Sequence, residues 1–453
     1  MGLGGGTFST MNKVLPGSYI RFESTGGILG NVGERGIVAM QMPLNWGPMH
    51  GFISVTAEEF YGDSLKLFGL PPDADELRNV REVLRGARVV KVYRSNIGGA
   101  ARVASFTGGG ISARAKHSGI FGNNIRVAVS FRMDDGNFVN VRTYVNGDEV
   151  DHRVVSSVQP FAIENDFVSI SGSSVVGNVE GALSGGANGA VLGMSYWNYL
   201  NAVEREEINV LCADTDNPIT LELYANFTKR LREEEGVKIV AVMFMGVAED
   251  LDWLPNDPNY EGIVNVSNLA YYDNARFGKD LIFWVAGQLA GAAPNESLTN
   301  RAYDGEYDIK LSPFTRRQIE HRLRNGVFMF YFARGEVRVL RDINSLRTFT
   351  ARRSREFSSN RVVRVLDSIS TDVSRIFNEF FIGRESNDEV GRNLFKVELI
   401  NYLEQLQAMQ AITNFVADDV SISQGPEKTD VVVELMVQPV DSMEKLYMTV
   451  KVV

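Results

Sequence analysis

The order of hydrophobic and polar residues in the middle of this chain predicts a β-rich region. Ile125, Val127, Val129 and Phe131 alternate with smaller or polar residues, which is the period of a half-buried strand. A second alternation over residues 139–145 runs into the turn dipeptide Asn146-Gly147. Residues 106–189 hold 13 of the 43 glycines and show little helical period. We expect an inserted β-rich outer domain over this range.

The flanking regions have the pattern of an α/β domain. Residues 208–213 and 237–246 are continuous apolar runs, which suit strands covered on both faces. Residues 218–235 between them have the length of a crossover helix. Further strands are expected near 36–40, 87–93, 327–332 and 336–340, and a helix near 75–85. Residues 25–105 and 190–349 therefore predict one α/β core domain that is interrupted by the insertion.

Residues 350–445 predict an α+β domain. Apolar residues from Val362 to Phe380 recur at steps of three and four, the period of a helix face. A second helix is expected over 388–415, with its buried face formed by Leu394, Val397, Ile400, Leu403, Leu406 and Met409. The period then becomes two along residues 431–437, and we expect a turn over 438–445. The expected fold class is α+β multidomain.

Both ends of the chain look like strands. Tyr19, Ile20 and Phe22 follow a Pro-Gly turn, and the last eight residues alternate, with Lys451 as their only charge. An unpaired strand with an apolar face promotes aggregation unless something covers it. One interpretation is that neighbouring copies pair with residues 1–24 and 446–453, which would act as terminal arms. The other is that both strands pair inside their own domain. The arm residues are Val14, Tyr19, Ile20, Phe22, Leu446, Met448, Val450 and Val452.

Charge and composition narrow the classes of function. The net charge of −10 argues against general nucleic-acid binding. One window departs from this balance, because residues 316–364 contain 13 arginines, no lysine and four acids, a net charge of +9. The window predicts either a solvated basic face with salt bridges or a docking surface for an acidic partner.

Cysteine use and hydropathy indicate folding in a reducing compartment without a membrane span. Cys212 is the single cysteine, so no internal disulfide can form. The Gly-rich start lacks the pattern of a signal peptide. The longest apolar runs, near 239–247 and 281–293, are shorter than the ~20 residues that a spanning helix needs.

The search for catalytic groups finds one candidate. The four histidines lack metal-ligand spacing, and the glycine-rich segments lack the Gly-Lys-Ser/Thr ending of a phosphate loop. Asp214 and Asp216 follow a predicted strand, where paired acids could hold Mg²⁺ or act in acid–base chemistry. The simpler interpretation is a turn that caps the helix beginning at Pro218. We expect no catalytic, cofactor or metal residue.

Several ordered motifs resemble one family. Residues 13–20, with Pro16-Gly17-Ser18-Tyr19, resemble the Pro-Gly-Val-Tyr opening of contractile tail sheath proteins. Residues 117–125 resemble the family's Gly-x-x-Gly-Asn turn, and residues 183–189 resemble its Gly-rich return from the inserted domain. Residues 289–300, 336–346 and 359–453 are similar to sheaths of Gram-positive phages, defective prophages and R-type bacteriocins.

The resemblance implies a structural role. It implies six-fold rings of this chain stacked around an inner tail tube, with terminal arms that join neighbouring copies and an extended state that later contracts. Baseplate and tail terminator proteins would be further partners, with no nucleic acid and no membrane insertion. Synthesis in the bacterial cytoplasm would precede incorporation into a virion tail or tail-like particle. The candidates for tube contact are Arg352, Arg353, Arg355, Arg361, Arg364, Arg392 and Lys396.

Two other classes of function stay open from the residues. The first is an α/β enzyme that uses Asp214 and Asp216, and the missing catalytic constellation counts against it. The second is a non-contractile filament or surface-layer subunit, and the lack of a secretion signal counts against it.

Overall fold

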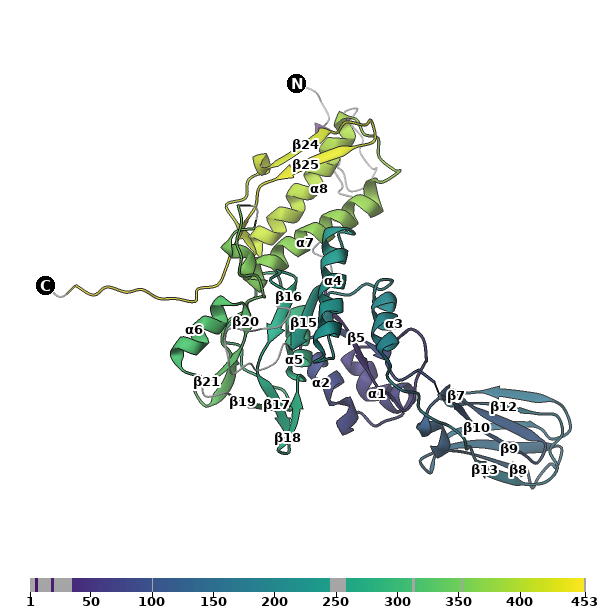
Figure 1. Ribbon diagram of the computed structural model, residues 1–453. Coiled ribbons are helices and arrows are strands. Elements are labelled where there is room, and N and C mark those ends of the chain that lie inside the picture. Colours follow the sequence, from purple (N-terminus) through teal and green to yellow (C-terminus); the bar gives the residue numbers. More distant parts are fainter. Residues whose placement is uncertain are drawn as a thin grey trace. The chain divides into compact units, whose positions relative to one another are not determined.

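The computed structural model describes residues 5–6, 18–19, 35–99, 101–244, 258–311, 314–351 and 353–451 (Figure 1). The chain forms two compact units. The larger unit comprises Glu34–Asp367 and Asp441–Val453, and the smaller unit comprises Met1–Gly33 and Ser368–Val440. Helix α7 (Asn360–Ile376) belongs to the larger unit as far as Asp367 and to the smaller unit from Ser368.

A seven-stranded sheet forms the centre of the larger unit. Six of its strands are parallel, and the seventh pairs antiparallel at one edge. Across the sheet the order is β20 (Val327–Phe328), β16 (Ile263–Val266), β15 (Val240–Phe244), β14 (Val210–Cys212), β3 (Ile37–Met42), β5 (Val89–Arg94) and the antiparallel β4 (Phe52–Val55). The predicted apolar runs are therefore buried parallel strands, as expected for a sheet covered on both faces.

Helices cover both faces of this sheet. Val38 and Met40 of β3 pack in one hydrophobic cluster, whereas Ala39 between them packs in another. The first cluster includes α1 (Ala57–Phe68), α2 (Arg78–Leu84) and α5 (Leu281–Gly291), and the second includes α3 (Gly193–Val203) and α4 (Pro218–Glu233). The predicted crossover helix is α4, which begins at Pro218 behind the capping side chain of Asn217.

Glycines allow α2 and α5 to approach closely. A Cβ atom at Gly287 would lie 2.2 Å from the Val83 carbonyl oxygen, and one at Gly291 would lie 1.9 Å from that of Gly86. Any side chain at these positions would push the two helices apart. All residues of α5 from Leu281 to Ala290 are buried, so the helix has no exposed side toward which it could move.

Smaller sheets and one helix complete this part of the larger unit. They comprise the sheet β17 (Leu269–Tyr272), β18 (Ala275–Gly278) and β19 (Asp308–Lys310), the helix α6 (Arg316–Arg324), and the hairpin β21 (Phe330–Ala333) and β22 (Glu336–Val339). The strand expected over 327–332 is thus two strands, β20 and β21, in different sheets.

Residues 103–182 form two antiparallel four-stranded sheets around a shared core. One sheet has the order β10 (Asp148–Ser156), β9 (Phe138–Val145), β8 (Ile125–Phe131) and β13 (Val179–Ala182), and the other has β11 (Phe161–Glu164), β12 (Val168–Gly172), β7 (Ile111–Ser118) and β6 (Val103–Gly108). Ile125, Val127 and Val129 point into the core, as their alternation predicted. Asn146 and Gly147 join β9 to β10 with φ of 53° and 101°, the left-handed turn that this dipeptide favours.

The chain enters and leaves this β-sandwich at one place. Gly98 and Ala190 exchange two backbone hydrogen bonds, of 3.1 and 2.9 Å. Beside this crossing, the Trp46 ring lies 5.0 Å from the rings of both His117 and Phe121. Arg94 donates a 2.7 Å hydrogen bond to the Ser118 carbonyl oxygen. The sandwich is therefore packed against its neighbours and not merely tethered to them.

The smaller unit contains a long helix and a β-hairpin. Helix α8 (Glu389–Ala408) packs against β24 (Val420–Gln424), which pairs with β25 (Val431–Leu435) (Figure 1). A short pair joins β23 (Ile412–Thr413) to β26 (Gln438–Pro439), and β1 (Gly5–Gly6) pairs with β2 (Ser18–Tyr19). Tyr402 of α8 donates a 3.0 Å hydrogen bond to the buried Asp372 of α7.

Three predictions for the C-terminal region are wrong. Helix α8 ends at Ala408 and not at 415. Leu394 and Val397 are 45% and 52% exposed, whereas Leu403 and Leu406 are buried as predicted. The rest of the buried face is formed by Phe395, Leu399 and Tyr402. The segment 438–445 is not a simple turn, because it begins with β26.

The contact between His117 and Trp46 predicts a pH-dependent stability. Burial, with the nearby charges of Lys116 and Arg94, lowers the pKa of His117 to about 4. The unfolded chain, with a pKa of about 6.5, binds the proton first, so stability falls as pH drops through this window. We expect a loss of about 1–2 kcal/mol between pH 7 and pH 5, which discounts the full shift for partial solvent contact. Urea unfolding followed by Trp fluorescence measures it. His117→Gln should flatten this slope, and a slope equal to that of the exposed His152→Gln variant would contradict it.

The helix contact predicts a large difference between two Gly→Ala substitutions. Gly287→Ala should lower the free energy of unfolding by about 3 kcal/mol, because the new methyl group overlaps backbone atoms of Val83. Gly62 on α1 has no atom within 4 Å of a built Cβ. Gly62→Ala should therefore leave stability unchanged or raise it by up to about 1 kcal/mol. Equal effects in denaturant unfolding would rule out the close contact.

Candidate assembly surfaces

The acidic pair proposed for catalysis is a structural turn. The Asp214 carboxylate lies 2.9 Å from the Lys279 ammonium. Burial raises the pKa of Asp214, and Lys279 opposes this shift. Asp216 is exposed, and Asn217 caps α4 by accepting from the amides of Ile219 and Thr220. Among the described residues there is no group of three His, Cys, Asp or Glu side chains that could hold a metal ion.

Cys212 lies in the same region and is inert. Its side chain is fully buried, and burial raises the pKa of the thiol well above its ordinary value. A protonated, enclosed thiol is neither a nucleophile nor a metal ligand.

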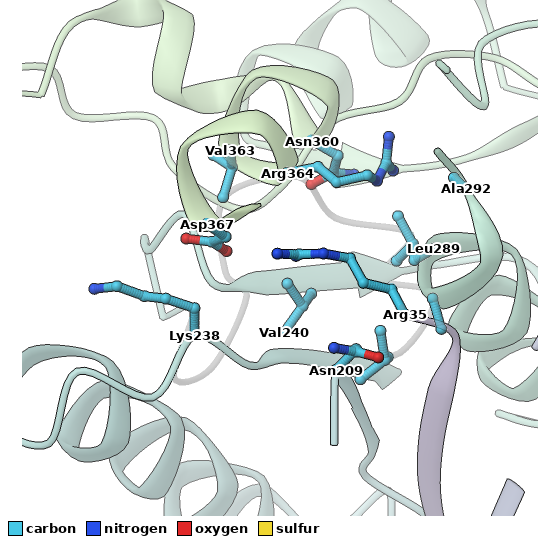
Figure 2. Close-up of a pocket in the computed structure, with 12 residues that line it drawn as sticks. Arg35, Asn209, Lys238, Val240, Leu289, Ala292, Asn360, Val363, Arg364 and Asp367 are labelled. Carbon is cyan, nitrogen blue, oxygen red and sulfur yellow. The ribbon is translucent and has the colours of Figure 1, made fainter. Parts of the chain in front are cut away.

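A pocket lies where helix α7 begins, beside the starts of β14 and β15 (Figure 2). Its volume is about 40 Å³. Figure 2 shows the Arg35 side chain lying across the middle of the pocket, with Asp367 and Arg364 on the helix above it. The lining residues are Arg35, Asn209, Val210, Lys238, Val240, Leu289, Ala290, Ala292, Asn360, Val363, Arg364 and Asp367.

The charged groups of this pocket form hydrogen bonds and ion pairs with other residues of the larger unit. Asp367 accepts two hydrogen bonds from the buried Arg232 of α4, of 2.7 and 2.8 Å. Burial alone would lower the pKa of Arg232, but the charge and hydrogen bonds of Asp367 raise it above its ordinary value. Arg364 donates to the Glu296 carbonyl oxygen at 2.7 Å and lies 3.7 Å from Asp342. We interpret the pocket as a junction between α7, α4 and the sheet, not as a substrate site.

The C-terminal segment has a fixed root and an exposed end. Arg341 donates a 2.7 Å hydrogen bond to the Glu444 carboxylate, and Thr299 donates a 3.0 Å bond to its other oxygen. Ser359 donates to Asp441 at 3.1 Å. Beyond this root, Leu446, Met448 and Val450 are 85%, 74% and 71% exposed. This segment was expected to be a strand, but residues 440–451 pair with no strand in the described part of the chain.

The N-terminal arm residues are described only in part. Tyr19 lies in β2, where its backbone pairs with Gly6. Val14, Ile20 and Phe22 lie outside the described residues, as does Val452 at the other end of the chain.

Two of the candidate tube-contact arginines lie in the interior of the larger unit. Arg361 and Arg364 are largely buried, and the burial of Arg364 lowers its pKa. Arg353 lies 2.9 Å from Glu233 and 3.5 Å from Glu261. Arg355 is exposed, and Arg352 lies outside the described residues. Arg361 and Arg364 are therefore corrected to interior residues.

Helix α8 has exposed apolar residues on one side and basic residues on another. Val390, Leu394 and Val397, at steps of four and three, are all exposed. Arg392, which donates to Asn387, and Lys396 are both half-buried on the same helix. The sequence predicted that Leu394 and Val397 would be buried, but tertiary packing leaves them exposed.

The structure contains a groove, lined in part by arginines, that the sequence did not predict. It has a volume of about 290 Å³. Arg324, Arg341 and Arg355 line it together with Leu346 and Phe349. These residues come from α6, the loop after β22 and the loop before α7. All lie in the arginine-rich window over residues 316–364, so the sequence predicted their charge but not the groove. Among the described residues, no helix is long and apolar enough to cross a membrane.

Known families match three segments of the chain. Residues 35–94 match the tail sheath protein Gp18 domain III N-terminal region, residues 189–345 match the phage tail sheath protein central domain, and residues 353–453 match the phage tail sheath C-terminal domain.

Full-length relatives agree with these matches. The phage-like element PBSX protein XkdK of Bacillus subtilis is 32% identical, over 99% of this chain and all of that protein. The sheath tail protein of Desulfitobacterium hafniense has 35% identity and a TM-score of 0.76, covering 95% of this chain and 99% of that one. The sheath tail protein of Listeria innocua has 30% identity and a TM-score of 0.80, covering 93% and 95%.

A more distant structure shares the fold alone. The anti-feeding prophage helical sheath in its contracted state is 12% identical, with a TM-score of 0.56 over 97% of this chain and 99% of that one. The mixed α/β multidomain architecture is therefore a sheath fold, as the sequence motifs suggested. From the three family matches and the near full-length relatives, we conclude that this chain belongs to the contractile phage tail sheath family.

Proposed function

We propose that this chain is a non-enzymatic subunit that polymerises around an inner tail tube, and that the polymer contracts from a metastable extended state. The observation that carries the proposal is the C-terminal segment, which has a clamped root and an exposed apolar end. A monomeric protein would be expected to cover such a segment. Head-to-tail contacts that do not close on themselves generate helical filaments.

The domain roles follow from this proposal. Residues 1–24 and 446–453 act as arms, and residues 25–105 and 190–349 form the core. Residues 106–189 are the inserted outer domain, and residues 350–445 are the tube-proximal polymerisation domain. The β-sandwich core over residues 103–182 supports the assignment of the insertion.

The arm of one copy would pair with the hairpin β24–β25 of another. This sheet has only two strands among the described residues, so each strand has an unpaired outer edge. Two-stranded sheets are marginally stable alone, and a third strand with an apolar face would stabilise this one. Leu446, Met448, Val450 and Val452 share one face of the arm, since side chains alternate along a strand.

Contraction needs no nucleotide in this proposal. The extended lattice would store free energy at assembly and release it when larger interfaces form. Six-fold rings, a baseplate and a tail terminator would complete the particle, which would be made in the bacterial cytoplasm and act as a virion tail or tail-like extracellular particle.

The inner tube would contact α8. Arg392 and Lys396 supply positive charge one helical turn apart, on a different side of the helix from the exposed Val390, Leu394 and Val397. Of the loop arginines, Arg353 already pairs with Glu233 and Glu261, whereas Arg355 has no ion pair among the described residues. Partly exposed charges of this kind can template assembly and still release.

A substitution in the arm should stop polymerisation without unfolding the subunit. We expect Met448→Asp to reduce tube formation at least tenfold, because a carboxylate on the apolar face would be buried without a partner. The neighbouring Thr449→Asp variant, on the opposite face, should assemble normally. Negative-stain microscopy and sedimentation measure assembly, and circular dichroism checks the fold. Equal tube yields from both variants, or normal tubes after deletion of residues 446–453, would exclude the arm mechanism.

Charge reversal on α8 should separate tube binding from self-assembly. The double variant Arg392→Glu/Lys396→Glu should lower the fraction of sheath that cosediments with inner tubes by about tenfold, while polymers without a tube still form. The matched control is Arg114→Glu/Lys116→Glu, a pair exposed on β7 of the sandwich. Unchanged cosedimentation of the α8 variant would remove these residues from the tube contact.

A further inference from the structure

The arginine groove lies at the root of the C-terminal arm. Arg341 lines the groove and also holds Glu444, the last residue before the exposed segment. Leu446, the first apolar residue of the arm, follows two positions later, and two extended residues span about 7 Å. A hairpin that receives the arm must therefore begin close to the groove.

The charge of the groove calls for an acidic occupant. No Asp or Glu is among the residues that line it. Arg324 has its nearest carboxylate, Glu320, at 3.9 Å, and Arg355 has no ion pair among the described residues. The rest of the lining includes the apolar Leu323, Leu346 and Phe349. A complementary surface would combine a free carboxylate with exposed apolar side chains.

The two ends of the hairpin β24–β25 differ in their charge and in their exposed apolar side chains. One end is the turn over residues 425–430, where the exposed Glu427 is followed directly by the positive Lys428, and where the Asp430 carboxylate already accepts from the amide of Glu427. The other end carries Asp418, which is exposed and has no hydrogen bond or ion pair among the described residues. Val416 and Met436 beside it are also exposed. The second end matches the groove in both charge and polarity.

We propose that the groove of Arg324, Arg341 and Arg355 docks the hairpin end formed by Val416, Asp418 and Met436 of a second copy, the copy that receives the arm. This rests on the arm exchange proposed above. The docked end fixes which end of the hairpin the arm enters first, so the contact sets the register of strand addition. It also assigns Arg355 to a neighbouring sheath subunit and not to the inner tube.

Engineered cysteines test the contact directly. The native Cys212 is buried, so an added pair reacts without background. Polymers of Arg355→Cys/Asp418→Cys should give a ladder of covalent multimers under mild oxidation on a non-reducing gel, because each copy has both a groove and a hairpin end. The matched control pair is Arg355→Cys/Asp63→Cys, with Asp63 exposed on α1, and it should stay monomeric. Assembled polymers that give no ladder, or a cross-link confined to single chains, would overturn the proposal.

A charge exchange provides a second readout. Arg355→Asp and Asp418→Arg should each slow polymerisation about tenfold, and the double variant should regain most of the rate. Additive losses in the double variant would contradict the pairing. Deletion of residues 446–453 separates the two proposals. If polymers need the arm but show no ladder, the groove contact alone fails. If polymers form without the arm, the arm exchange fails.

Discussion

Residues 445–451 impose the constraint on which the rest of this protein depends. Their backbone donors and acceptors are unpaired in the described chain, and alternate side chains are apolar and exposed. Water can satisfy the backbone groups but not the apolar face. A single copy therefore leaves this apolar face in contact with water. In the proposed assembly, a second copy would cover it.

An exposed segment is useful only if the body that carries it is rigid. The sheet with its two helical layers, the Gly-to-backbone contact of α2 and α5, and the buried pair of Arg232 and Asp367 supply this rigidity. Breaking a buried ion pair by removing one partner costs about 3–5 kcal/mol. The bond from Arg341 to Glu444 fixes the start of the exposed C-terminal segment on the same body.

Local pattern predicted the elements of this fold well, and long-range contacts set what it missed. The apolar runs at β14 and β15, the crossover helix α4 and the alternation in β8 depend on neighbouring residues, so periodicity is sufficient for them. Helix α8 has apolar residues on more than one face, at Leu394, Phe395, Val397 and Leu399, and only packing against β24 selects the buried set.

The candidate site residues also divide into those that local pattern predicts and those that depend on long-range contacts. Alternation along residues 446–452 is a local signal, and the arm candidates came directly from it. The bond between Arg341 and Glu444 joins residues 103 positions apart, and the groove takes residues from three separate segments. Arg364 lies in the arginine-rich window, and this local signal made it a candidate for tube contact. It is instead largely buried, close to Asp342.

The paired crossing at Gly98 and Ala190 bears on how the β-sandwich can change during evolution. Because the chain departs and comes back through adjacent backbone segments, a replacement module needs only two neighbouring attachment points, whatever its own length. Related chains could exchange the sandwich while the seven-stranded sheet stays the same, provided that Trp46 is still covered. The same junction is a rational graft point for a foreign domain.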